Sequence, residues 1–152
     1  MSPAVPSAPR IVLDTNVCLD LFLFNDPRCA ELMAALQRGA VVAVTREDCF
    51  AEWCKVLHYP QLPIDDTIRP AVSAGFDALI HHLSADESTP SDDSVLPVCA
   101  DPDDQKFLQL ALASKSRWLI SKDKELLKLD RHSRKVGLFP ILLPEQWSLT
   151  VD

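Results

Sequence analysis

The sequence predicts an α/β fold in which helices cover a central parallel sheet. Three short, continuously apolar segments, at residues 11–13, 41–44 and 118–120, are typical of strands that are buried on both faces. The stretches between these segments repeat their apolar residues at helical spacing. Strands that alternate with helices form a parallel sheet with right-handed crossovers, so the order of the elements predicts this fold class.

The first half of the chain is expected to hold two strands and three or more helices. The apolar run at 17–24 predicts a helix, and residues 29–36 predict an amphipathic one that ends near Gly39, a typical C-cap residue. After the strand at 41–44, Thr45 and Asp48 resemble a capping box that starts a third helix. Apolar residues at helical spacing then predict a longer helix from about residue 66 to Leu83.

The second half begins with a loop at 84–94 that is rich in Ser, Asp, Pro and Thr, followed by a candidate extended segment at 95–98. A helix is predicted from residue 104, then the strand at 118–120, a helix after Asp123 and a last strand at 139–143. No internal repeat or long linker divides the chain. We therefore expect a frayed tail at residues 1–9 and a single domain at residues 10–148.

The composition favours a globular intracellular protein. Apolar residues make up 47% of the 152 positions, and no apolar run reaches the roughly 18 residues that a membrane span requires. The N-terminal residues lack the apolar stretch of a signal peptide, so we expect a cytoplasmic protein that does not enter a membrane. The five cysteines are odd in number and include no C-x-x-C pair, which favours free, buried thiols over disulfides or zinc ligands.

Charge is distributed unevenly along the chain. The net charge is −7, yet residues 105–135 hold nine basic and only three acidic side chains. Such a block is either a solvated helix face or a face that binds phosphates. The composition alone leaves both interpretations open.

Acidic residues recur where the predicted strands end or the following helices begin: Asp14, Glu52, Asp104 and Asp123. The carboxyl ends of parallel strands meet at one edge of a sheet, so these four side chains are able to converge. Converging carboxylates repel one another unless a cation neutralises them, and carboxylates suit Mg²⁺ or Mn²⁺. Each acid also has a purely structural interpretation, as a helix cap, a complement to a helix dipole or a solvated helix residue.

Four motifs and a closing strand follow one another in a distinctive order: Leu13-Asp14-Thr15-Asn16; Phe50-Ala51-Glu52-Trp53; Asp101-Pro102-Asp103-Asp104-Gln105-Lys106-Phe107-Leu108 running to Ala111; Ser121-Lys122-Asp123-Lys124-Glu125-Leu126-Leu127; and Pro140-Ile141-Leu142-Leu143-Pro144. Over roughly residues 10–147 the chain resembles the PIN-domain family, and most of all the bacterial PIN group that supplies the toxins of toxin–antitoxin pairs. The resemblance implies a three-layer α/β/α fold, similar to the 5′-nuclease fold, with a parallel sheet of about five strands. It also implies a Mg²⁺- or Mn²⁺-dependent ribonuclease, often a homodimer and often inhibited by a cognate antitoxin.

Carried over residue by residue, the acidic tetrad of the family falls on Asp14, Glu52, Asp104 and Asp123, as catalytic residues and metal ligands. The resemblance gives supporting roles to Asn16 and Ser121, and Asp101 would contribute through water. Thr15 would be a cap or a structural hydroxyl. Lys122 and Lys124 flank Asp123 where a glycine is common before the acid. With Lys106 they would contact substrate phosphates, or the pair at 122 and 124 would partly take the role of the metal.

The resulting expectation is an endoribonuclease that hydrolyses RNA phosphodiester bonds, leaving a 5′-phosphate and a 3′-hydroxyl. One alternative is a non-catalytic module on the same fold that binds RNA or a protein partner. A second is a phosphatase of the haloacid dehalogenase type. That class needs a second acid two residues after the first, where this chain has Asn16.

Overall fold

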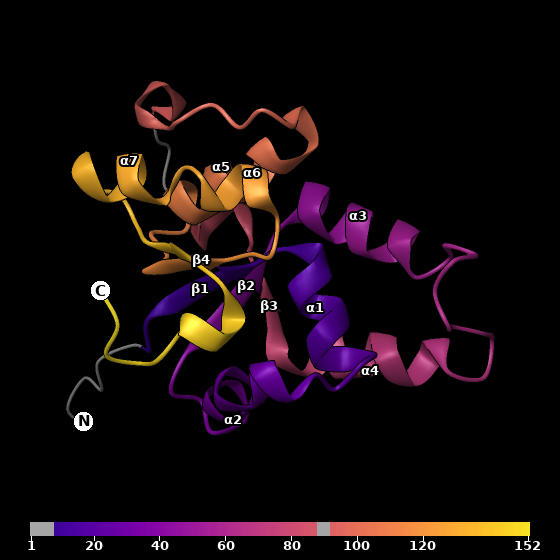
Figure 1. Cartoon of the computed structure of the whole chain (residues 1–152). Helices are drawn as coiled ribbons and strands as arrows, with labels where there is room; N and C mark the ends of the chain where they lie inside the picture. The colour runs from indigo at the N-terminus through magenta and orange to yellow at the C-terminus, as the bar shows by residue number, and fades with distance from the viewer. Residues whose placement is uncertain (1–7, 88–91) are drawn as a thin grey trace.

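The structure is a computed structural model that describes residues 8–87 and 92–152. Within them, five parallel strands form one sheet in the order β3-β2-β1-β4-β5 (Figure 1). The strands are β1 (Arg10–Leu13), β2 (Val42–Thr45), β3 (Ile80–His82), β4 (Trp118–Ile120) and β5 (Ile141–Leu142). Most of the predicted tail, residues 1–7, lies outside the described residues.

The α-helices of the described residues cover both faces of the sheet (Figure 1). They are α1 (Thr15–Phe22), α2 (Ala30–Gln37), α3 (Glu47–Val56), α4 (Arg69–Leu79), α5 (Gln105–Ala113), α6 (Lys124–Leu127) and α7 (Asp130–Lys135). Helices α1, α2 and α4 lie on one side of the sheet, and α5, α6 and α7 lie on the other. This arrangement confirms the predicted three-layer α/β/α fold.

Alternate residues of the central strand enter two separate cores. Ile11 and Leu13 pack with residues of α1, α2, α3 and α4, whereas Val12 packs with residues of α5 and α6. All three side chains are at most 6% exposed, because a strand that is covered on both faces buries both of its alternating sets. The continuous apolar run at 11–13 is thus explained by burial on both sides.

The third strand of the sheet differs from the prediction. Residues 95–98 contain no strand, and the last turn of the predicted long helix is replaced by β3, where Ile80 has extended backbone angles and pairs with Ala43. The spacing of Leu79, Ile80 and Leu83 fits a helix as well as it fits a short strand. Because β3 lies at the edge of the sheet, only Ile80 of its residues is buried, and no apolar run marks it.

Two smaller expectations are also corrected. Thr45 is the last residue of β2 instead of a helix cap, and the extended residue before α3 is Arg46, whose guanidinium pairs with Asp48. All five cysteines are free thiols as predicted, but Cys54 is exposed while the other four are buried. Among the described residues, no helix is long and apolar enough to cross a membrane.

Candidate active site

Asp14 lies where β1 passes into α1, close to the centre of the sheet. Its extended backbone makes it the N-cap of α1, and its Oδ1 accepts a hydrogen bond of 2.9 Å from the amide of Val17. Its Oδ2 accepts a hydrogen bond from the hydroxyl of Ser121, at the end of the neighbouring strand β4. The side chain is therefore both a helix cap and a fixed carboxylate at the carboxyl edge of the sheet.

Burial makes the negative charge of Asp14 costly. The residue is 4% exposed, and desolvation raises its pKa from 3.8 to about 6, although the hydrogen bonds from Ser121 and Val17 oppose this rise. A bound cation would stabilise the ionised form of this buried carboxylate, so Asp14 is suited to be a metal ligand.

Ser121 connects Asp14 with Asp123. The Ser121 hydroxyl donates to Asp14 and accepts a hydrogen bond of 2.9 Å from the amide of Asp123. Asp123 is the N-cap of α6, and its Oδ1 accepts from the amide of Glu125. The supporting position predicted for Ser121 thus lies between two of the four predicted acids.

Three acids form a compact cluster beside Asp14. Asp101, Asp104 and Asp123 each offer a carboxylate oxygen, and these oxygens lie within 4.8 Å of one another. Asp101 caps the 3-10 turn that leads into α5, and Asp104 is its last residue, so the turn lies against Asp123 at the start of α6. The oxygens are close enough to share one cation of the size of Mg²⁺ or Mn²⁺.

Asp104 is the member of the cluster that most lacks a partner. Its Oδ2 is buried, and among the described residues no group hydrogen-bonds to it. Burial, and then the neighbouring Asp123 carboxylate, raise the pKa of Asp104 to about 7. A buried oxygen without a donor beside two further carboxylates is an arrangement that a divalent ion would complete, so the residues present fit the metal that the family resemblance implies.

Glu52 lies on α3, across the site from this cluster. Its Oε2 accepts a hydrogen bond from the hydroxyl of Thr15, and its Oε1 lies 2.9 Å from the Lys106 ammonium. Thr15 therefore has a definite partner in the site, in line with its predicted structural role.

A pocket of about 180 Å³ brings the predicted acids together. Its polar lining consists of Asp14, Thr15, Asn16, Glu52, Asp104 and Asp123. Val56, Tyr59 and Phe107 provide apolar wall, and sequence reasoning did not select these three for the site. Their apolar character marks them as core residues, and only the fold shows that they also border the acids.

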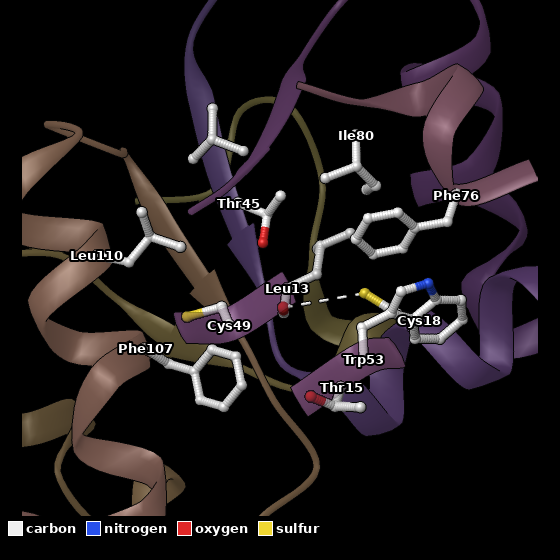
Figure 2. A pocket seen from close by; sticks show the side chains of 11 residues that line it. Leu13, Thr15, Cys18, Thr45, Cys49, Trp53, Phe76, Ile80, Phe107 and Leu110 are labelled. Atoms are coloured by element: carbon white, nitrogen blue, oxygen red, sulfur yellow. Dashed lines mark hydrogen bonds between the residues drawn. The ribbon is translucent and has the colours of Figure 1, made fainter. Parts of the chain in front are cut away.

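A small, mostly apolar pocket adjoins the acidic pocket (Figure 2). Thr15 and Phe107 line both pockets, and Trp53 and Cys18 belong to the apolar one. Trp53 is 2% exposed and stacks on Phe76 with a centroid distance of 4.7 Å, so it is a core residue and is not available to stack on a base. The acidic pocket thus lies next to packed apolar side chains that join α1 and α3.

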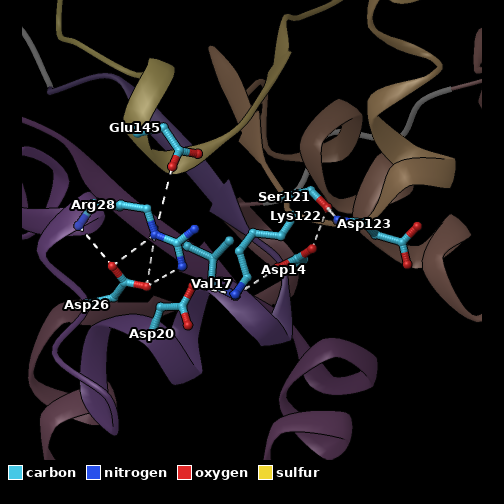
Figure 3. A network of polar contacts seen from close by, with 9 residues as sticks. All are labelled: Asp14, Val17, Asp20, Asp26, Arg28, Ser121, Lys122, Asp123 and Glu145. Carbon is cyan, nitrogen blue, oxygen red and sulfur yellow. Dashed lines mark hydrogen bonds and ion pairs between the residues drawn. The ribbon is translucent and has the colours of Figure 1, made fainter.

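Two of the three predicted phosphate-binding lysines are held by acids of the chain itself. Lys106 pairs with Glu52, and Lys122 points towards α1, where its ammonium lies 2.7 Å from Asp20 (Figure 3). Lys124 is exposed, and no ion pair to it is found within the described residues. Of the basic block at 105–135, Lys124 is thus better placed than Lys106 or Lys122 to meet an external phosphate.

A family model described as PIN domain matches residues 10–125, a range that includes every acid of the site. The chain belongs to the PIN-domain family. PIN domains are nucleases and generally depend on a divalent metal, so the acidic pocket lies in a protein of a nuclease family. This match confirms the family resemblance, and the five-stranded parallel sheet agrees with it.

Solved structures share the fold at low sequence identity. One chain in the crystal structure of VapBC2 from Rickettsia felis, bound to a DNA fragment from their promoter, superposes with a TM-score of 0.55 at 11% identity. The alignment covers 87% of this chain and 96% of that one. No curated protein matches the sequence significantly.

Proposed function

We propose that this PIN domain is a Mg²⁺- or Mn²⁺-dependent endoribonuclease and the toxin of a toxin–antitoxin pair. The observation that carries the proposal is the acidic pocket itself. Asp14, Asp104 and Asp123 converge there from three elements, and the buried Oδ2 of Asp104 has no partner among the described residues. The family match supports a nuclease over a phosphatase of the haloacid dehalogenase type.

Asp14, Asp104 and Asp123 would hold the divalent ion, with Asp101 close enough to contribute. When bound, the ion would polarise a phosphoryl oxygen and increase the acidity of a water molecule. Ser121 keeps Asp14 and the amide of Asp123 in fixed positions, so the pocket needs little rearrangement to take up charge.

Glu52 would orient the attacking water from the opposite wall. Each of its oxygens already accepts one hydrogen bond, and a carboxylate oxygen is able to accept a second. The water attacks phosphorus, the bond from phosphorus to the 3′-oxygen breaks, and the products carry a 5′-phosphate and a 3′-hydroxyl. This route needs no covalent intermediate with the protein.

Two further features of the proposal concern substrate and partners. RNA as the substrate is supported by the family resemblance and by the exposed Lys124 beside the acids. A cognate antitoxin is supported by the fold shared with a chain of the VapBC2 complex. We also propose a homodimer, which light scattering of the purified protein will test.

The test is incubation of the protein with total RNA and with tRNA, with and without Mn²⁺, followed by mapping of the cut ends. We expect cuts that require Mn²⁺ and leave 5′-phosphates. The Asp14→Asn variant should remain folded and should not cut. Binding of RNA in EDTA without turnover in Mn²⁺ would instead support a non-catalytic binding module.

A further inference from the structure

The four predicted acids are not equivalent in the structure. Both oxygens of Glu52 are engaged by groups of the chain, one by the hydroxyl of Thr15 and the other by the ammonium of Lys106 at 2.9 Å. The side chains of Lys106 and Glu52 are 17% and 26% exposed, so the pair is largely shielded from water. Glu52 thus enters the pocket already neutralised by a cation.

Lys106 also connects two walls of the pocket. Besides Glu52 on α3, its ammonium binds the backbone carbonyl of Asp103, in the turn that presents Asp104. A lysine ammonium is charged at neutral pH, and this one lies 2.9 Å from Oε1 of Glu52. One side chain therefore ties α3 to the turn and neutralises its carboxylate partner.

The remaining acids lack such compensation. The oxygens of Asp101, Asp104 and Asp123 lie within 4.8 Å of one another, and the buried Oδ2 of Asp104 has no partner among the described residues. Among the described residues, no cation pairs with the carboxylates of this cluster, whereas Glu52 is neutralised by Lys106. A divalent ion would therefore compensate charge at the cluster.

We propose that Glu52 and Lys106 form a permanent ion pair, in which Lys106 is a positioning residue and Glu52 is not a ligand of the divalent ion. The ion is bound by the cluster of Asp101, Asp104 and Asp123 with Asp14. For Glu52 to become a ligand it would either release Lys106, whose shielded ammonium would keep only the Asp103 carbonyl, or bring the divalent ion next to that ammonium, where the two positive charges repel each other. Leaving a shielded charge without its partner is costly. This inference rests on the proposed function only in assuming that the pocket takes a divalent ion.

The test measures Mn²⁺ affinity of the full chain by calorimetry in the absence of RNA. Glu52→Gln should weaken Mn²⁺ binding by no more than about three- to tenfold, because it removes a negative charge near the ion but no ligand, whereas Asp104→Asn should lose about 30-fold or more. Lys106→Met should bind Mn²⁺ about three- to tenfold more tightly, because a positive charge near the ion is gone and Glu52 is released. Lys106→Arg keeps the charge and should restore the affinity of the wild type.

A matched control is Lys128→Met, which breaks an exposed lysine–glutamate pair of similar length, 3.0 Å, outside the lining of the pocket. Its Mn²⁺ affinity should not change. A loss in Glu52→Gln as large as that in Asp104→Asn would overturn the inference, and so would an unchanged affinity in Lys106→Met.

RNA cleavage separates the two proposals. If the affinities follow this pattern but no RNA is cut, the proposed function is wrong and the ion pair stands. If RNA is cut but Glu52→Gln loses as much Mn²⁺ affinity as Asp104→Asn, only the ion-pair assignment is wrong.

Discussion

Replacing Asp14 by asparagine should stabilise the metal-free protein at neutral pH although it removes a residue of the proposed active site. The folded state holds Asp14 with a pKa of about 6, against 3.8 for the exposed group, because burial penalises the charge. A carboxyl group with a raised pKa stabilises the fold fully only below its unfolded pKa, and this stability is lost as the pH rises through the folded pKa. Asparagine has the same shape and carries no charge to desolvate.

The size of the effect follows from the shift. The pKa of Asp14 differs by about two units between the folded and the unfolded state. Its charge therefore lowers the free energy of unfolding by about 3 kcal/mol at pH 8, where Asp14 is ionised in both states, and by about 0.5 kcal/mol at pH 4. The substituted asparagine would retain the hydrogen bond from the Val17 amide through its carbonyl oxygen, and its amide group would donate to the Ser121 hydroxyl. We therefore expect the stability of Asp14→Asn relative to the wild type to increase by about 2.5 kcal/mol between pH 4 and pH 8.

The assay is urea unfolding of both proteins in EDTA at several pH values between 4 and 8. Asp26→Asn is a control of opposite character, because hydrogen bonds from Arg28 lower the pKa of Asp26 to about 2. Its stabilising contribution is present throughout this range, so that variant should be less stable than the wild type by a constant amount. A constant difference for Asp14→Asn, or a variant less stable than the wild type at pH 8, would refute the reasoning. Added Mn²⁺ should stabilise the wild type more than the variant, because the variant lacks one ligand.

Three further predictions concern the pocket and the polar contacts around it. Ser121→Ala removes the buried hydroxyl that donates to Asp14 and should lower the free energy of unfolding by about 1–3 kcal/mol in urea titrations, and an unchanged value would show that the hydroxyl contributes little. Because a proton competes with the ion at Asp104, whose pKa is raised to about 7, Mn²⁺ affinity measured by calorimetry should rise up to about tenfold per pH unit between pH 5 and 7 and then level off. Lys122→Met leaves the buried Asp20 without its cation and should cost about 1–3 kcal/mol of stability in the same titrations, whereas a loss of RNA affinity at unchanged stability would show that the lysine serves the substrate instead.

The central strands of the fold could be predicted because each is buried on both faces. The sequences at 11–13 and 118–120 are apolar without interruption, and no helix of that length would bury every side chain. Strand β3 could not be predicted because it lies at the sheet edge, where His81 and His82 remain exposed. The residues that precede β3 follow helical spacing, so the spacing predicts that the helix extends over residues 80–82.

The convergence of the acids could be predicted for a related reason. Asp14 and Asp123 follow parallel strands, and parallel strands end at one edge whatever the order in which they are arranged. The partners of the lysines could not be predicted in this way. Lys106 meets Glu52 from a different helix, and Lys122 meets Asp20 across the end of the sheet, so both contacts depend on how the elements pack and on where long side chains turn. A charge pattern along the sequence does not contain that information.

The hydrogen bond between Ser121 and Asp14 joins positions 107 residues apart, and it depends on the pairing of β1 with β4. During synthesis, a chain that has emerged from the ribosome only as far as α5 already contains Asp14, Glu52 and Asp104 but has no β4 to place beside β1. Such a chain lacks both Ser121 and Asp123, so the pocket assembles only after most of the protein has been made. The long-range closure of the sheet thus keeps the unfinished chain without its acidic pocket, because that pocket requires β4 beside β1.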